Sequence, residues 1–410
     1  MYNTPIAKMP RNSHFKPGRE PLAHSTSLQL DDGITGPIQI LNPTHAKFRH
    51  VSTQQAGSDI SFRWNSRNNR KGRHALRVRS VPNQAPAQTP PSSASPRVIL
   101  RNIGRMFTKY PVYDVSWVVA YLFTWGSIVW VFNAFFAWLP SERPSSEFTN
   151  EILYGGGITA FIGATIFEVG SIFLMLEAVN ANRAGCFGWA VEQLFEDQHH
   201  PTSNSDPEKA SLLRVQPALN RCVHHHPNRK NLVGKSANIE EKGSEISAHG
   251  DGRSWAWWPS WADLRSHYLH ELGFLASFVQ LLAASIFWIA GLTALPGINN
   301  KMSQGLLDGI YWTPQVVGGT GFIISGFLFM LETQKRWYKP ALHVLGWHIG
   351  FWNLIGGLGF TLCPAFGYDT HSWAQYQAGL STFWASWAFL IGSVIQLYES
   401  LDKNPVKVKS

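Results

Sequence analysis

Charge is what this sequence has little of. Asp, Glu, Lys and Arg make up 15% of its 410 residues, against roughly 25% in ordinary soluble domains. Cysteine is also scarce, and Cys186, Cys222 and Cys363 lie too far apart to suggest a metal site or a disulfide framework. No apolar segment follows the first methionine, so a cleavable secretory signal is not expected. These absences exclude a small disulfide-stabilised secreted domain and argue against an ordinary soluble one.

Catalytic motifs are missing too. The chain has no phosphate-binding glycine loop, no HExxH pair and no nucleophile elbow. His343 and His348 are five residues apart, so they project about 140° from each other and disfavour a haem bound within one helix. The sequence thus identifies no catalytic residue, no metal ligand and no cofactor, and it favours a non-enzymatic protein.

Long apolar runs are what the sequence does contain. Each of six runs has about 20 residues or more, enough to cross a hydrocarbon core of roughly 30 Å at about 1.5 Å per residue. The sequence therefore predicts an all-α membrane protein with six transmembrane helices. The runs cover residues 115–139, 155–178, 271–295, 312–332, 343–366 and 374–398.

Two polar segments lie outside these runs, at 1–96 and 183–254. Both are rich in polar or charged residues, and such segments bury too little apolar surface to offset the entropy of ordering. We expect them to form a disordered tail and a disordered linker. Basic residues recur every four positions over 97–111, which predicts a juxtamembrane amphipathic helix that binds anionic lipids of the bilayer.

The helices divide the rest of the chain. We predict two-helix unit 1 over 112–182, an interfacial helix with two-helix unit 2 over 255–340, two-helix unit 3 over 341–402, and a tail over 403–410. The interfacial helix is suggested by the aromatic stretch "SWAWWPSWADLRSHYLHE", in which Ser260 and Asp263 are spaced as a capping box.

Positive charge indicates the orientation. With both termini placed in the cytosol, 33 of the 35 Lys and Arg residues lie on the cytosolic side and only Arg143 and Lys301 lie opposite. The net charge of +9 is then explained by attraction of basic residues to anionic lipids and by the orientation of the helices. No nucleic-acid partner is expected, because aromatic residues do not alternate with the basic ones. Prolines interrupt the basic N-terminal segment, so a plasma membrane or endomembrane is favoured over the mitochondrion.

The second, fourth and sixth apolar runs end alike. They read "FEVGSIFLMLE", "FIISGFLFMLE" and "FLIGSVIQLYE", and the other runs share the fainter pattern "GSIVW", "ASIFW" and "GGLGF". We interpret this as three copies of a two-helix repeat, whose small residues allow close helix contact. The matched positions are Phe167, Phe322 and Phe389; Gly170, Ser325 and Gly392; and Glu177, Glu332 and Glu399.

Two kinds of carboxylate stand out. Each repeated glutamate is at a helix C-terminus, where the macrodipole disfavours it, so we expect a partner nearby and a structural role. Glu168 has no counterpart in the other copies and lies about 13.5 Å from the predicted cytosolic helix end. An intramembrane acid is a functional candidate, although a protonated packing residue is the alternative. Gln280 and Asn353 have similar depth, so we predict one midplane polar cluster with Glu168.

The paired helices with these small and apolar ends resemble the two-helix units of bacterial YrhK-like membrane proteins. Residues 112–400 as a whole resemble fungal multi-pass integral membrane proteins of uncharacterised function. The resemblance implies a fold but no activity. We therefore favour transport of a small solute, ion or proton through the polar cluster; the alternative is a non-enzymatic scaffold that organises lipids or partners. The sequence predicts neither a substrate nor an oligomeric state.

Overall fold

Six long helices dominate the computed structural model of the chain, and all six are apolar enough to cross a membrane. The prediction of a six-span helical membrane protein is confirmed. The helices are α3 (Val115–Glu142), α4 (Gly157–Val179), α7 (Leu272–Thr293), α9 (Thr313–Thr333), α10 (Leu345–Gly367) and α11 (Ser372–Leu401). The structure describes residues 28–50, 60–73, 75–79, 92–181, 184, 255–403 and 405–409.

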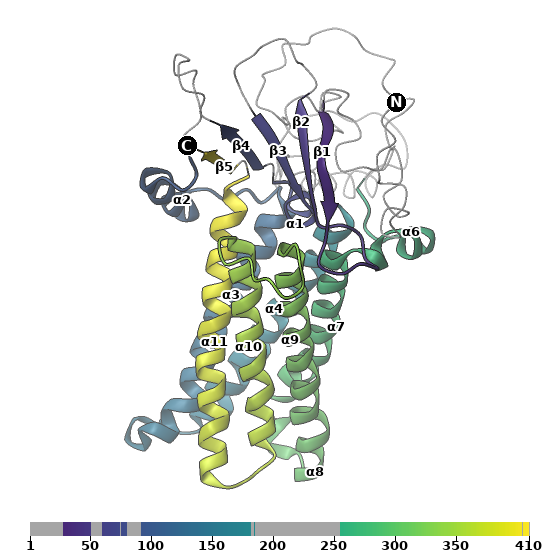
Figure 1. Cartoon of the computed structure of the whole chain (residues 1–410). Helices are drawn as coiled ribbons and strands as arrows, with labels where there is room; N and C mark the ends of the chain where they lie inside the picture. The colour runs from purple at the N-terminus through teal and green to yellow at the C-terminus, as the bar shows by residue number, and fades with distance from the viewer. Residues whose placement is uncertain are drawn as a thin grey trace, which may run out of the picture.

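The six helices form a closed ring. Each packs mainly against its neighbours in sequence, and α11 returns to pack against α3. Successive helices run in opposite directions, and apart from the long segment between α4 and α7 their connections are short (Figure 1). Such a ring has a central axis that every helix can reach with one face.

Short elements join these helices. Asp114 caps α3 by accepting a hydrogen bond from the backbone N–H of Ser116 at 2.9 Å. At the opposite end of the ring, α4 and α9 each begin with a π-helical turn, a form often found at functional sites. The short elements are η3 (Pro144–Ser146), η4 (Ile152–Gly156), η8 (Tyr268–His270), η9 (Asn299–Lys301), α8 (Gln304–Leu306) and η10 (Leu307–Trp312).

A five-stranded sheet lies over one end of the ring, which we call the sheet end (Figure 1). Its strand order is β1-β2-β3-β4-β5, with antiparallel pairs except for β4 and β5, which are parallel. A five-residue helix, α1 (Ser66–Arg70), lies between β3 and β4. The strands are β1 (Leu28–Thr35), β2 (His45–His50), β3 (Ile60–Asn65), β4 (Ala75–Arg79) and β5 (Val406–Lys409).

This sheet corrects one expectation. Disorder is predicted for all of 1–96, but the described parts of that segment include four strands and α1. The cause is visible in "HAKFRH" and "ISFRWN", which alternate apolar and polar residues at the period of a strand. The average composition of 96 residues hides two such short patterns. In addition, β4 pairs with β5, which lies at the far end of the chain and cannot be recognised from the N-terminal segment alone.

Two short amphipathic helices flank the sheet end (Figure 1). One is α2 (Pro96–Thr108), at the position where the sequence predicts a juxtamembrane helix. The other is α6 (Trp261–Ser266), capped by the hydroxyl of Ser260, which accepts from the N–H of Asp263 at 3.1 Å as the capping box predicts. The predicted linker at 183–254 lies outside the described residues except for Ala184.

Candidate functional site

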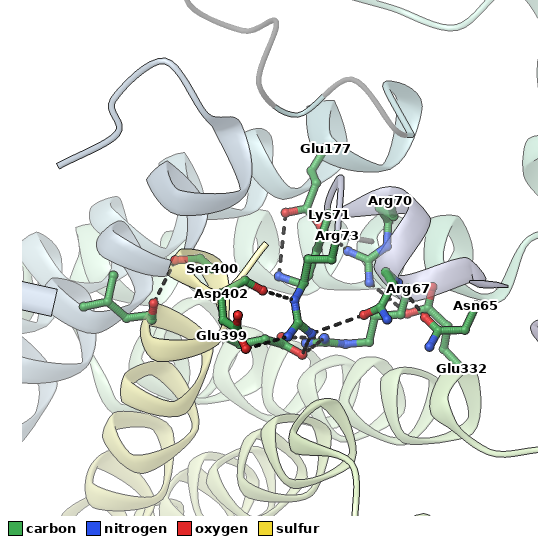
Figure 2. A network of polar contacts seen from close by, with 12 residues as sticks. Asn65, Arg67, Arg70, Lys71, Arg73, Glu177, Glu332, Glu399, Ser400 and Asp402 are labelled. Carbon is green, nitrogen blue, oxygen red and sulfur yellow. Dashed lines mark hydrogen bonds and ion pairs between the residues drawn. The ribbon is translucent and has the colours of Figure 1, made fainter. Parts of the chain in front are cut away.

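α1 and the loop that follows it place four buried cations at the sheet end of the ring. α1 begins where the side chain of Asn65 accepts a hydrogen bond from the N–H of Asn68 at 2.6 Å. In the sequence "RNNRKGR" every third residue is an arginine. The side chains of these arginines point towards the ends of the membrane-spanning helices (Figure 2). We call the four cations the basic plug: Arg67, Arg70, Lys71 and Arg73.

The plug binds the three repeated glutamates, which we call the glutamate ring (Figure 2). Arg70 donates from Nη1 to Glu177 at 2.5 Å and from Nη2 to Glu332 at 2.8 Å. Glu399 accepts from Nη1 of Arg67 at 2.5 Å and from Nη1 of Arg73 at 2.7 Å. All three glutamates are at most 1% exposed. One short segment of the N-terminal region thus ties together the ends of α4, α9 and α11.

Charge compensation explains why so many ions can be buried here. A buried charge is costly unless it is paired and hydrogen-bonded. The glutamates also oppose the macrodipoles of their own helices, so the plug offsets a second unfavourable term. Five cations in this region face five carboxylates, because Asp114 and Asp402 add to the glutamate ring and Lys403 adds to the plug.

Arg70 and Lys71 respond differently to burial. Burial lowers the pKa of the Arg70 guanidinium, but the carboxylates of Glu332 and Glu177 outweigh this effect and raise it above its usual range. For Lys71, burial lowers the pKa to about 8, and Glu177 opposes that effect only in part. The charge of the Lys71 ammonium is therefore less fully compensated by neighbouring carboxylates than that of Arg70.

Two glycines make room for the plug. A Cβ atom on Gly273, near the start of α7, would lie 2.8 Å from Nε of Arg70. A Cβ atom on Gly346, near the start of α10, would lie 2.7 Å from Nε of Arg67. The corresponding residue of α3 is Ser116, which is also small and fully buried. These small residues allow α1 to sit against the helix ends.

A cavity of about 30 Å³ lies next to the plug, inside the ring. Arg67, Arg70 and Lys71 line it on one side. This volume holds about two water molecules, because one water needs roughly 10–15 Å³ of such space. The cavity is therefore a site for water or a very small ion, and an organic ligand would need the ring to open.

The other walls of the cavity are amide and aromatic. Gln280 of α7, Asn353 of α10 and Gln396 of α11 contribute amides. Within the described part of the chain, no hydrogen bond is made by these three amide groups, so they can serve whatever occupies the cavity. Phe167 and Phe389 form part of the side opposite the plug.

An aromatic layer closes the axis beyond the cavity. Each helix contributes one buried ring, and neighbouring rings contact one another with centroids 4.8–6.4 Å apart. Phe167 is ten residues before Glu177, so the layer lies about 15 Å below the glutamate ring. The six rings belong to Trp130, Phe167, Phe287, Phe322, Phe360 and Phe389.

The predicted polar cluster is divided in the structure. Gln280 and Asn353 line the cavity, as described, but Glu168 does not. Glu168 faces α7, where the hydroxyl of Ser285 donates to its Oε1 at 2.9 Å. Equal depth was a poor guide, because Glu168 is one residue after Phe167 and therefore about 100° away from the face that reaches the axis.

The matched residues of the repeat occupy similar places. Phe167, Phe322 and Phe389 all belong to the aromatic layer, and the three glutamates all meet the plug. The small residues lie at helix contacts: a Cβ on Gly170 would touch the Phe123 ring at 3.4 Å, and a Cβ on Gly392 would lie 3.2 Å from Oδ1 of Asn353. The hydroxyl of Ser325 donates to the carbonyl of Ala276 at 2.9 Å. A common origin of the three units stays a prediction.

One alignment within the repeat needs correction. The patterns "GSIVW" and "ASIFW" match Trp130 with Trp288, but the residue in the aromatic layer is Phe287. Trp288 instead donates from Nε1 to the hydroxyl of Thr165 at 3.0 Å, on the flank of α4. Because Phe287 and Trp288 are adjacent aromatic residues, the sequence alone does not show that the alignment is wrong by one residue.

Sequence reasoning missed the plug, although signals for it exist. The three arginines at every third residue match three glutamates in number. The first helices of the three units also begin alike, with "VSW", "LGF" and "LGW", which place Ser116, Gly273 and Gly346 at matching positions near the plug. Either pattern could have indicated that the three helix pairs share one partner.

Comparison with known proteins adds no assignment. No family model, no curated protein and no solved structure matches the chain. The resemblance to YrhK-like units and to fungal multi-pass proteins therefore stays a prediction, and the function has to be argued from the site itself.

Proposed function

We propose that this multi-pass membrane protein is a gated transport protein, which conducts a small polar solute or ion along the axis of its six-helix ring. The observation that carries the proposal is the polar cavity on the inner side of the plug. Amides inside a membrane-spanning ring have no partner in lipid, so a polar space at this position favours a passing or bound solute. Gln280 and Asn353 keep the role expected of them, whereas Glu168 is outside the path.

The described state has two seals on this path. The basic plug closes the sheet end with ion pairs, and the aromatic layer closes the middle with apolar rings. Apolar constrictions are a known way to stop ions, because they exclude water. Opening would require both seals to move, and the plug belongs to a folded domain that a signal outside the membrane can reach.

The sheet end faces the cytosol in this proposal, because almost all Lys and Arg residues lie on that side. α2 supports the same orientation. Its exposed residues include Leu100, Ile103 and Phe107 on one face, and Arg97 and Arg101 on another. An apolar face and a basic face on one helix suit an anionic leaflet. We propose that α2 lies on the cytosolic leaflet.

Conductance of the reconstituted full chain tests the transport function. Phe322→Ala should remove the aromatic seal, so that movement of the plug alone opens the path, and the KCl conductance of a planar bilayer should then exceed that of the wild type. The matched control is Phe327→Ala, because Phe327 is on the same helix but 46% exposed on its outer side. The proposal fails if folded Phe322→Ala and wild-type protein both leave the bilayer no more conductive than a protein-free one.

A scaffold function is the second candidate. It is favoured by the plug itself, since the buried ion pairs between a folded domain and the ring could serve only to hold that domain on the membrane. In that case Phe322→Ala reduces stability without creating a conductance. The same measurement therefore separates the two functions.

A further inference from the structure

We infer that the cavity beside the basic plug is a binding site for one small monovalent inorganic anion of about the size of chloride. The role of the anion rests on the proposed function, because the anion would be what the path carries or senses. The binding itself requires no transport. It can therefore be measured at equilibrium, whatever the outcome of the conductance experiment.

Lys71 is the first argument. Its side chain is 1% exposed, and Nζ has no hydrogen-bond acceptor within the described residues. The nearest carboxylate oxygen is Oε2 of Glu177, at 3.7 Å. An ammonium group carries three N–H donors, and leaving them without acceptors in a buried place is unfavourable. An acceptor inside the cavity would satisfy them.

The charges around the cavity select the sign of the ligand. Arg67, Arg70 and Lys71 line it, and no carboxylate is among its lining residues. The glutamates accept from Nη1 of Arg67 and from both Nη atoms of Arg70, whereas Nε of Arg70 and Nζ of Lys71 have no acceptor within the described residues. At such short distances a cation would be repelled, whereas an anion would be attracted by all three groups.

The amides complete the set of donors. Gln280, Asn353 and Gln396 come from three different helices, and each amide NH₂ group can donate to an anion from a direction that the plug leaves open. Apolar side chains, Phe167 and Phe389 among them, line the rest of the cavity. Donors on one side and rings on the other are suited to a weakly hydrated, singly charged ligand.

Size limits the choice further. A cavity of about 30 Å³ has room for roughly two water molecules. A halide ion with one water fits this space, whereas sulfate, phosphate and organic acids do not without movement of the ring. Water alone is the competing occupant, because it also accepts hydrogen bonds from an ammonium group.

The test is thermal unfolding of the full chain in zwitterionic nanodiscs, in sodium chloride and in sodium gluconate at equal ionic strength. Equal ionic strength removes general screening of the ion pairs. Chloride in large excess over its Kd should raise Tm by about 3 °C over gluconate. Lys71→Met should abolish this difference, while the control Lys301→Met, an exposed lysine at the opposite end, should retain it.

Asn353→Leu gives an independent check if Lys71→Met fails to fold. It removes a donor and fills part of the cavity, so it too should abolish the chloride effect, and sodium sulfate should resemble gluconate with the wild type. Equal Tm in chloride and gluconate for the wild type would mean that only water occupies the cavity and would overturn the inference. So would a chloride effect of unchanged size in folded Lys71→Met or Asn353→Leu.

Discussion

Arg70 donates to carboxylates on two different helices, and this makes it the plug residue with the largest expected effect on stability. Arg70→Gln leaves Glu177 and Glu332 buried without their main partner. Breaking buried ion pairs from one side costs about 3–5 kcal/mol, so we expect a large decrease in the thermal stability of the purified protein. Arg70→Lys should recover only part of it, because an ammonium cannot form the same forked contact.

The control for this prediction is Arg101→Gln. Arg101 is exposed on α2, where loss of a charge should change stability by less than about 0.5 kcal/mol. If Arg70→Gln is as stable as Arg101→Gln, the buried ion pairs do not hold the plug to the ring.

Glu168 is predicted to be a packing residue. The hydroxyl oxygen of Ser285 lies 2.9 Å from both Oε1 of Glu168 and the carbonyl oxygen of Leu281, and this hydroxyl has a single proton. It can serve only one of them, and a glutamine at 168 could donate to the Ser285 oxygen while that proton serves Leu281. We therefore expect Glu168→Gln to match the wild type in folded yield and conductance, and Glu168→Leu to reduce folded yield. A loss of conductance in folded Glu168→Gln would return Glu168 to the transport path.

At the scale of elements, the contact between α1 and the start of α7 depends on a missing side chain. Gly273→Ala would place a methyl group 2.8 Å from Nε of Arg70 and closer still to Glu332. Such overpacking costs about 1–3 kcal/mol. We expect trypsin to cut the plug at Arg67, Arg70 or Lys71 faster in this variant, because the plug has to move out.

Gly305→Ala is the matched control, since nothing lies within 4 Å of a Cβ atom at that position. It should leave the rate of cleavage in the plug unchanged. Equal rates in the two variants would show that Arg70 and Glu332 adjust without displacing α1, and the role given to the glycine would be wrong.

The helices could be predicted from the sequence because lipid requires long uninterrupted apolar runs, and these are visible locally. The repeated glutamates could be recognised as anomalous, since each opposes its own helix dipole. Their partner could not be found in the same way. Arg67 lies more than a hundred residues before Glu177, in a segment whose average composition resembles that of a disordered tail. The sequence predicts no aromatic layer: the repeat matches Phe167, Phe322 and Phe389, but Phe287 and Trp288 differ by one residue and the pattern fits either.

At the scale of the whole molecule, the described parts of the N-terminal and C-terminal segments meet on one side of the ring. β5 comes from the C-terminal segment and pairs with β4 from the N-terminal one, while Lys403 binds Asp114 at 2.7 Å and the backbone oxygen of Lys71 at 2.8 Å. The sheet, the plug and the ring are therefore parts of one body. A change in the sheet can reach the cavity through α1, and the gating proposed above would use this connection.

The orientation of this body in the membrane is the last prediction. Ser145 and Thr370 lie exposed in connections at the end of the ring opposite the sheet. Positive charge gathers at the sheet end, so these connections should face away from the cytosol. Single cysteines at either position, in a variant with Cys186, Cys222 and Cys363 replaced by serine, should react with a membrane-impermeant maleimide applied to intact cells or sealed luminal vesicles. A cysteine at Thr108, exposed on α2, should react only after the cytosolic side is opened. Labelling in the reverse pattern would place the sheet outside the cytosol, and the plug would then close the other mouth of the path.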